Sequence, residues 1–216
     1  MGLIGADEAG KGPVLGSMFA AAIRVPDDRA FPAGIRDSKD LSPECREELA
    51  AALREAPDVY IGLAEVTPSR IDDPSTDMNT LTVAAQAEAI AAVVRQGDRC
   101  VLDASDVRPA RFANRVGNRL ETTATIDAFH RADEDHPVVS AASIVAKVER
   151  DAHVADLAEE YGPIGSGYPS DPETRSFLEE FVLEEARLPD CARRSWQTCA
   201  EVIATAEQAG LADFYR

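Results

Sequence analysis

The sequence predicts a mixed α/β fold, in which helices flank a mixed β-sheet and a helical region follows at the C-terminus. Three observations support this class. Two apolar runs joined by a glycine-rich turn stand at the N-terminus, which is typical of a β-hairpin. Short apolar runs then alternate with helical patterns through the middle of the chain. In the last third, the patterns are almost all helical.

Five strands are expected. The first, at 3–9, is apolar apart from Asp7 and Glu8, and the turn "GKGP" separates it from the second, at 14–25. The fourth is a short buried strand that carries Asp103. The last three strands are expected at 58–66, 100–105 and 121–127.

Six helices are expected between and after these strands. Ser42 and Pro43 form an N-cap and a first-turn proline for the first helix. The second is rich in alanine, has apolar positions at helical spacing, and is followed by Gly97. The six helices are expected at 44–56, 79–96, 109–119, 136–160, 171–186 and 196–209.

The length and composition suit one well-packed domain with a small appendage, because the chain has 216 residues and is 45% hydrophobic. The most loop-like stretch is "GPIGSGYPSDP" at 162–172. We therefore expect a main domain at 1–161 and a helical C-terminal region at 162–216. Nothing in the sequence requires a dimer, so a monomer is expected.

The sequence lacks the features of exported and membrane proteins. No run approaches eighteen apolar residues, and the N-terminus has neither a basic region nor a cleavage site. The cysteines show no CxxC spacing and no small disulfide framework. A cytoplasmic protein is expected, with buried thiols at Cys45, Cys100, Cys191 and Cys199.

The charge is strongly acidic, with a net value of −17 from 39 acids and 22 bases. Among the bases, only Lys11, Lys39 and Lys147 are lysines. An acidic surface poor in lysine is typical of extreme halophiles; the alternative is an ordinary acidic protein. At ~1 M salt the Debye length is only ~3 Å, so long-range repulsion does not exclude a nucleic-acid partner.

Asp7, Glu8 and Asp103 form a candidate metal site, because each lies in or at the end of an apolar strand. A buried carboxylate must be neutralised, paired or bound to a metal, and hard divalent cations prefer oxygen ligands. Adjacent strand residues point to opposite faces, so the first strand must end or bend here, or one acid must act indirectly. A further acid could be Asp133 or Asp135. The alternative is a set of solvated acids at strand ends.

A resemblance to a phosphate-binding loop fails at two positions. Gly5, Gly10 and Lys11 satisfy most of GxxxxGK[ST], but Gly12 replaces the hydroxyl residue and Pro13 has no N–H. Two carboxylates would also lie inside the phosphate cradle. Nucleotide binding is therefore not expected.

The three lysines are candidates for phosphate binding, because a lysine-poor surface leaves few of them. Lys11 lies in the glycine turn, Lys39 in "DSKDLS" and Lys147 in "SAASIVAK". The alternative is three ordinary salt-bridge partners.

Six blocks of the sequence together resemble ribonuclease HII in the form found in archaea. They are "GADEAGKGPVLGSM", "DSKDLS", "VLDASD", "PVVSAASIVAKVERD", "YGPIGSGYPSDPET" and "RRSWQT". They occur in order over nearly the whole chain, which makes the resemblance far more specific than any one block. It implies an RNase H-like fold, with the catalytic domain at 1–161, and an endonuclease that cuts the RNA strand of RNA/DNA hybrids. It also implies nicking at ribonucleotides embedded in duplex DNA, which leaves a 3′-hydroxyl and a 5′-phosphate.

The resemblance also assigns the catalytic acids. The family's four metal-binding acids correspond to Asp7, Glu8, Asp103 and Asp133, with Asp135 an open alternative to the last. The implied cofactor is a pair of Mg²⁺ or Mn²⁺ ions, because two metals ~3.5–4 Å apart stabilise both the attacking and the leaving oxygen. Asp7 and Asp103 would hold both ions, and Glu8 and Asp133 would complete the ligand shells.

The family's glycine–basic–glycine turn corresponds to Gly10, Lys11 and Gly12. It is implied to approach the ribose 2′-hydroxyl and the phosphate at the RNA–DNA junction, where glycine lets backbone come close. The basic residue is usually arginine in this family, and the sister ribonuclease HIII group carries lysine. Lysine lacks arginine's planar fork, so the preference between single ribonucleotides and longer hybrids stays open.

Three further residues are implied to contact nucleic acid. The family's junction-sensing tyrosine corresponds to Tyr168, and two phosphate-contacting positions correspond to Lys39 and Lys147.

The C-terminal sequence "QAGLADFY" resembles a sliding-clamp-binding box. Gln208, Leu211, Phe214 and Tyr215 have its Q-x2-L-x2-F-Y spacing. In this mode a short helical turn inserts apolar side chains into a clamp pocket. The alternative is a terminal helix that packs Leu211 and Phe214 on its own domain.

Two other functions are alternatives to a ribonuclease of the HII type. One is another RNase H-fold nuclease, such as a junction resolvase. The other is a catalytically silent module that binds hybrids, which loss of one of the four acids would indicate. No such loss is seen.

Overall fold

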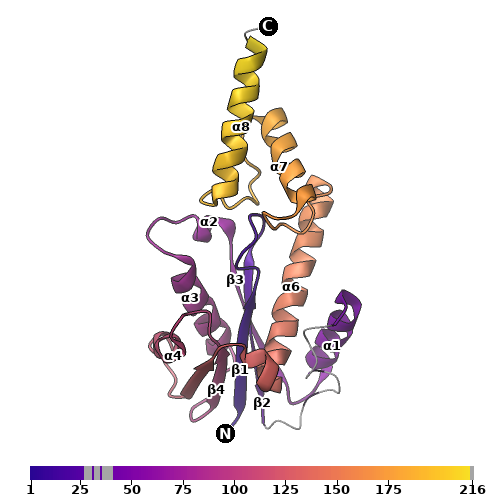
Figure 1. The fold of residues 1–216 in the computed structure, drawn as a ribbon. Coiled ribbons are helices and arrows are strands. Elements are labelled where there is room, and N and C mark those ends of the chain that lie inside the picture. Colours follow the sequence, from indigo (N-terminus) through magenta and orange to yellow (C-terminus); the bar gives the residue numbers. More distant parts are fainter. Residues whose placement is uncertain (27–30, 32–34, 36–40, 215–216) are drawn as a thin grey trace. The chain divides into compact units, whose positions relative to one another are not determined.

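The computed structural model of the 216-residue chain describes every residue except 27–30, 32–34, 36–40 and 215–216, and only the backbone of 209–214 (Figure 1). The described elements, in chain order, are β1 (Leu3–Ala9), β2 (Met18–Val25), α1 (Pro43–Glu55), β3 (Tyr60–Val66), α2 (Pro68–Ile71), α3 (Met78–Ala91), β4 (Arg99–Asp103), α4 (Pro109–Gly117), β5 (Thr125–Phe129), α5 (Ala132–Asp135), α6 (Pro137–Tyr161), α7 (Pro172–Glu185) and α8 (Gln197–Phe214).

The described strands form one mixed sheet in the order β3-β2-β1-β4-β5. β1 pairs antiparallel with β2, which confirms the predicted hairpin, and β2 pairs antiparallel with β3. β4 is parallel to both β1 and β5. The pairing of β1 with β4 stops at Ala6 and Leu102, whereas β1 continues along β2 to Ala9. The predicted mixed α/β fold is therefore confirmed.

The chain divides into two compact units. The sheet unit comprises Met1–Lys11, Met18–Val66 and Asp77–Arg150. The helical unit comprises Gly12–Ser17, Thr67–Thr76 and Asp151–Arg216. The functional division at residues 161 and 162 stays a prediction.

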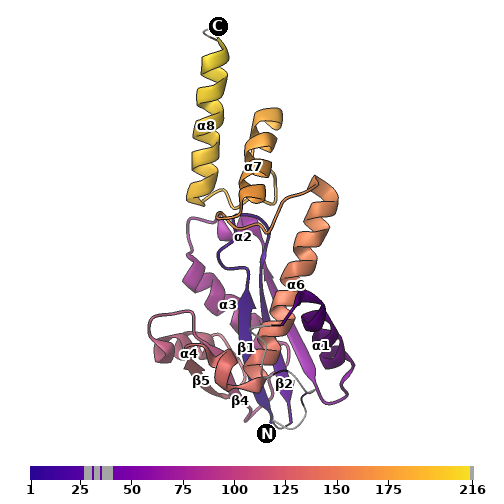
Figure 2. The same ribbon diagram turned by 45° about the vertical axis from the view of Figure 1, so that its right-hand side comes forward.

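Helices cover both faces of the sheet unit. On one face α1 and the first part of α6 pack on β2 and β4 through apolar side chains such as Leu53, Ile23, Val101 and Ile144. α3 and α4 lie on the other side of the strands (Figures 1 and 2). A Cβ added to Gly5 would lie 2.3 Å from the backbone of Val138, so β1 and α6 meet without a side chain between them.

The helical unit has its own core, built from buried side chains that include Leu15, Leu157 and Leu178. The segment Gly12–Ser17 is held by backbone hydrogen bonds inside this unit. Val14 N donates to the Gly167 carbonyl at 2.8 Å, and Gly16 N donates to the Cys191 carbonyl at 2.8 Å.

These hydrogen bonds explain why one strand prediction is wrong at its start. The second strand was expected from residue 14, but β2 begins at Met18 because residues 14–16 bond to other segments. The second helix was expected to reach 96, but α3 ends at Ala91. There the buried Asp98 carboxylate accepts the Arg95 N–H at 2.9 Å and draws the chain into a turn.

Other predictions differ in detail. The strand expected at 121–127 lies at Thr125–Phe129, and the short helices α2 and α5 were not expected. Three of the cysteines are buried as predicted, but Cys45 is exposed on the first turn of α1. No helix within the described residues has the length and apolar character needed to cross a membrane.

Candidate active site

Asp7 and Glu8 lie side by side on β1 and contact different helices. β1 runs without a break through Ala9, so the strand neither ends at these residues nor forms a phosphate loop. The Asp7 carboxylate, 7% exposed, faces α6 and forms a hydrogen bond with the Ser143 side chain. Glu8 faces α3, where Gln86 Nε2 donates to its Oε2 at 2.6 Å. The two acids therefore leave opposite faces of the strand, as its geometry requires.

Asp103 completes a three-acid cluster at the end of β4. Because β1 extends past the last residue of β4, Glu8 reaches the end of the neighbouring strand. Gln86 Nε2 also donates to the Asp103 carbonyl at 3.1 Å, so one buried amide bridges two acidic residues. The charge of Asp103 acts on both Asp7 and Glu8. The fold thus assembles these acids from strands about 95 residues apart in sequence.

The segment after β5 reaches back to this cluster. Arg131 has a left-handed backbone, with φ of 55°, and the following Ala132 N–H donates to Asp103 Oδ1 at 2.7 Å. This conformation is uncommon for a residue other than glycine and marks a constrained position. It sets the start of α5, and with it Asp133, beside Asp103.

Asp133 acts on the cluster, because its charge raises the pKa of Asp103. Asp133 and Asp135 both line a cavity of about 350 Å³ together with His136. This electrostatic contact favours Asp133 over Asp135 as the fourth acid, and the assignment stays a prediction.

Burial and mutual repulsion raise the pKa values of the cluster. Burial is the largest cause for each acid: it raises the pKa of Asp7 well above its usual value and that of Glu8 to about 6. Repulsion by Glu8 and Asp103 adds to the shift at Asp7. The Gln86 hydrogen bond and the charge of Lys11 act in the opposite direction on Glu8. The ionised forms of these acids are therefore disfavoured in the protein alone.

A pair of divalent cations would compensate this charge, and the donors fit such ions because they are all carboxylate oxygens. Among the residues that the structure describes, no three His, Cys, Asp or Glu side chains converge closely enough on one point to hold an ion.

The predicted substrate-reading residues lie in both units. In the sheet unit, Gly10 has φ of 85°, a left-handed conformation that favours glycine, and Lys11 Nζ donates to Asn79 Oδ1 at 3.2 Å. In the helical unit, the Gly12 carbonyl accepts the Trp196 indole N–H at 3.3 Å. A Cβ added to Gly12 would lie 3.5 Å from the Tyr168 ring, so backbone and ring are neighbours.

The remaining predicted residues are placed only in part. Lys147 lies on α6 one turn after Ser143, partly buried, whereas Lys39 falls outside the described residues. α8 continues to Phe214, so Gln208 and Leu211 are helical. Tyr215 falls outside the described residues.

Gln86 and Ser143 were missed by the sequence reasoning. Gln86 is fully buried, and a signal for it existed: it is a long polar residue on the apolar face of an alanine-rich helix, in register with Val83 and Ile90. Its Oε1 has no hydrogen-bond partner among the described residues. Ser143, 1% exposed, sits in a run of small residues that carries no comparable signal.

Comparisons with known proteins show the family of this chain. The family model of ribonuclease HII matches residues 4–199. A ribonuclease HII from the halophilic archaeon Haloarcula marismortui is 57% identical over 97% of this chain and 99% of its own length, which supports the predicted halophilic character. The crystal structure of ribonuclease H2 from Pyrococcus horikoshii OT3 has a TM-score of 0.87 at 37% identity, covering 96% of this chain and all of that one. The PCNA:RNase HII complex from Archaeoglobus fulgidus has a TM-score of 0.82 at 36% identity, covering 93% of this chain and 96% of that one. The predicted resemblance is confirmed, and the chain belongs to the ribonuclease HII family.

Proposed function

We propose that this protein, an endonuclease of the RNase H type, hydrolyses the RNA strand of RNA/DNA hybrids and nicks duplex DNA at embedded ribonucleotides. The observation that carries the proposal is the meeting of Asp7, Glu8 and Asp103 where β1 extends past β4. A cluster of carboxylates held at one strand end suits phosphodiester hydrolysis assisted by divalent cations.

The acids would act as ligands for two Mg²⁺ or Mn²⁺ ions. When bound, such ions supply an activated water and stabilise the leaving oxygen, which gives a 3′-hydroxyl and a 5′-phosphate. Asp7 and Asp103 are the proposed shared ligands, with Glu8 and Asp133 completing the shells. Ser143 and Gln86 orient Asp7 and Glu8 through their hydrogen bonds.

Substrate recognition is proposed to rest on the Gly10–Gly12 turn and Tyr168. The 2′-hydroxyl distinguishes RNA from DNA, and a turn without side chains at its glycines lets backbone approach that group. Lys39 and Lys147 are proposed phosphate contacts. Because Lys11 lacks the planar fork of arginine, the preference of the turn for a single ribonucleotide over a longer hybrid stays open.

The test is a metal-dependent cleavage assay that compares an RNA/DNA hybrid with a duplex containing one ribonucleotide, at low and at molar salt. Asp103→Asn should abolish hydrolysis and retain hybrid binding, because the amide keeps the volume but loses the ligand charge. Unchanged turnover of this variant would refute the metal role. Cleavage of a four-way junction in place of the hybrid would favour a resolvase, and binding without cleavage a silent module.

The C-terminal tail is proposed to bind a sliding clamp. Two observations support this: the spacing from Gln208 to Tyr215, and the structural similarity to a ribonuclease HII solved as a complex with PCNA. Deleting residues 208–216 should remove clamp binding in a pull-down and leave hybrid cleavage intact. A pull-down that survives the deletion would contradict the proposal and favour a helix that packs on its own domain.

A further inference from the structure

The segment 107–120 has an unusual composition for this chain. It contains four arginines and no acid, whereas the whole protein has 39 acids among 216 residues. Arg108, Arg111 and Arg115 are spaced three and four residues apart, so they share one face of α4 and its N-cap. Arginine concentrated on one face of a strongly acidic protein indicates a specific anionic partner.

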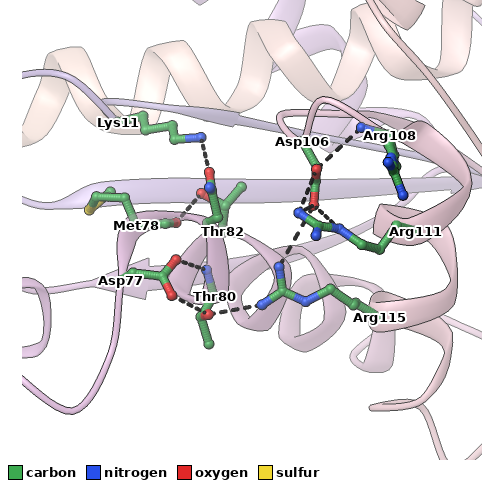
Figure 3. Close-up of polar contacts among 10 residues, drawn as sticks. Lys11, Asp77, Met78, Thr80, Thr82, Asp106, Arg108, Arg111 and Arg115 are labelled. Atoms are coloured by element: carbon green, nitrogen blue, oxygen red, sulfur yellow. Dashed lines mark hydrogen bonds and ion pairs between the residues drawn. The ribbon is translucent and has the colours of Figure 1, made fainter.

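The structure joins these arginines to the turn beside the candidate active site. Arg115 Nη2 donates to Thr80 Oγ1 at 2.8 Å in the first turn of α3, and the neighbouring Asn79 accepts from Lys11 Nζ at 3.2 Å. Figure 3 shows Lys11 and Arg115 at this turn, with Arg111 and Arg108 following along α4. All of these residues belong to the sheet unit. We call this row the α3–α4 basic surface: Lys11, Asn79, Thr80, Arg115, Arg111 and Arg108.

Apart from Glu8, on which the charge of Lys11 acts, two carboxylates lie at this surface, and both are already engaged. The Asp77 carboxylate caps α3, accepting the Thr80 N–H at 2.9 Å and the Thr80 hydroxyl at 2.8 Å. Asp106 is buried, with a side chain only 2% exposed, and its carboxylate accepts hydrogen bonds from Arg111 Nε at 2.9 Å and Arg111 Nη2 at 2.7 Å. Asp106 thus fixes the Arg111 guanidinium in place, and the four cations of the surface still outnumber its acids.

The ends of the guanidinium groups remain accessible. The Arg111 side chain is 59% exposed despite its ion pair. Arg108 is exposed beside Val107, which is 90% exposed, and within the described part of the chain no ion pair engages its guanidinium. From Arg108 to Arg115 the helix rises about 10 Å, a length that corresponds to about three phosphates of one strand along a duplex axis.

We propose that the α3–α4 basic surface binds backbone phosphates of the duplex substrate adjacent to the cleavage site. This inference deepens the proposed ribonuclease function and rests on it. The contacts are to phosphates and independent of sugar and base, because arginine donors matched to phosphate oxygens carry no sequence information. The surface thus supplies affinity and orientation, while the Gly10–Gly12 turn selects the ribonucleotide.

Arg108→Glu is the most informative variant. The Arg108 guanidinium is exposed and makes no ion pair with a described residue, so its replacement leaves no buried carboxylate there without a partner. Replacing Arg111, in contrast, would leave the buried Asp106 carboxylate without its ion pair. Arg187→Glu is the matched control, because it changes the net charge by the same amount. The Arg187 side chain is 54% exposed and belongs to the helical unit. Arg108→Lys retains the charge and should retain most of the affinity.

Binding to a fluorescently labelled hybrid, and kcat and KM for its cleavage, should be measured for each variant across a range of salt. We expect Arg108→Glu to weaken hybrid binding about tenfold at the lowest salt and to reduce the salt slope of log K by about 1. The loss should fall on KM, and an all-DNA duplex should lose affinity by the same factor. Arg187→Glu should match the wild type.

Equal binding by Arg108→Glu and the wild type would overturn the inference, as would a loss confined to ribonucleotide-containing duplexes, which would indicate a sugar-specific contact. A similar loss in Arg187→Glu would also overturn it, because the effect would then come from net charge alone. These outcomes differ from a failure of the proposed function, in which the wild type itself would neither bind nor cut the hybrid.

Discussion

Replacing Glu8 by glutamine should make the metal-free protein more stable at neutral pH. Glutamine is nearly isosteric, and its carbonyl can still accept the hydrogen bond from Gln86 that Glu8 Oε2 accepts at 2.6 Å. The substitution therefore removes the negative charge and keeps the contact. Asp7 and Asp103 remain, so the repulsion within the cluster falls.

The magnitude follows from the pKa of Glu8, which burial raises from its usual 4.5 to about 6. The folded state holds the proton more tightly than the unfolded state, so the stabilisation by the neutral form is complete below pH 4.5 and is lost as the pH rises through 6. The ionised form thus costs about 2 kcal/mol at ~pH 7.5 and about 0.8 kcal/mol at ~pH 5. Glu8→Gln should gain up to these amounts.

The measurement is chemical denaturation in molar KCl with EDTA, at about pH 7.5 and about pH 5. Glu180→Gln, at an exposed position of α7, is the control and should change the free energy of unfolding by less than ~0.5 kcal/mol. Adding Mg²⁺ or Mn²⁺ should stabilise the wild type more than Glu8→Gln. Two results would refute the view that burial and neighbouring carboxylates raise the pKa of Glu8. One is a Glu8→Gln protein that is no more stable than the wild type at the higher pH, and the other is a gain in the free energy of unfolding that is the same at both pH values.

Three further predictions concern the site and its support. Gln86→Leu should lower kcat about tenfold with folding retained, because Glu8 loses the hydrogen bond that orients it. An unchanged kcat would show that Gln86 does not position Glu8 for catalysis. Lys11→Arg should raise cleavage at one embedded ribonucleotide relative to an all-RNA hybrid, and an unaltered ratio would show that this side chain does not set the preference. Gly5→Ala should destabilise the protein by about 2 kcal/mol or more in thermal melts, since its Cβ would clash with α6 backbone, whereas Gly117→Ala, which meets only a flexible side chain at 3.2 Å, should not.

Much of the sheet and its acids could be predicted from sequence, because each strand carries a local apolar pattern. β1 lies at the predicted residues, and the charge of Asp103 acts on Asp7 and Glu8, whereas their role as metal ligands stays a prediction. Features set by distant partners could not be predicted in this way. The start of β2 depends on backbone contacts to Gly167, which lies about 150 residues away in sequence.

The site shows the same division. Asp7, Glu8 and Asp103 could be predicted because carboxylates in apolar strands are conspicuous, and the resemblance alone implied Asp133, but the residues that contact these acids could not be predicted. The apolar pattern of α3 predicts only that the face carrying Gln86 is buried. The role of Gln86 depends on the end of β4, whose Asp103 carbonyl accepts its hydrogen bond. The basic surface formed by the α4 arginines could not be predicted either, because it depends on the helix face they share and on the contact between Arg115 and Thr80.

The parallel pairing of β1 with β4 also constrains when the protein can become active during its synthesis. Asp7 and Asp103 meet only after the intervening segment has been made and the two strands have paired, and Asp133 is translated later still. Closing so long a loop is slow relative to local structure formation. With Asp133 as the proposed fourth acid, a nascent chain that has emerged only as far as β4 lacks part of the proposed metal site, and we expect cleavage only after most of the sheet unit has left the ribosome.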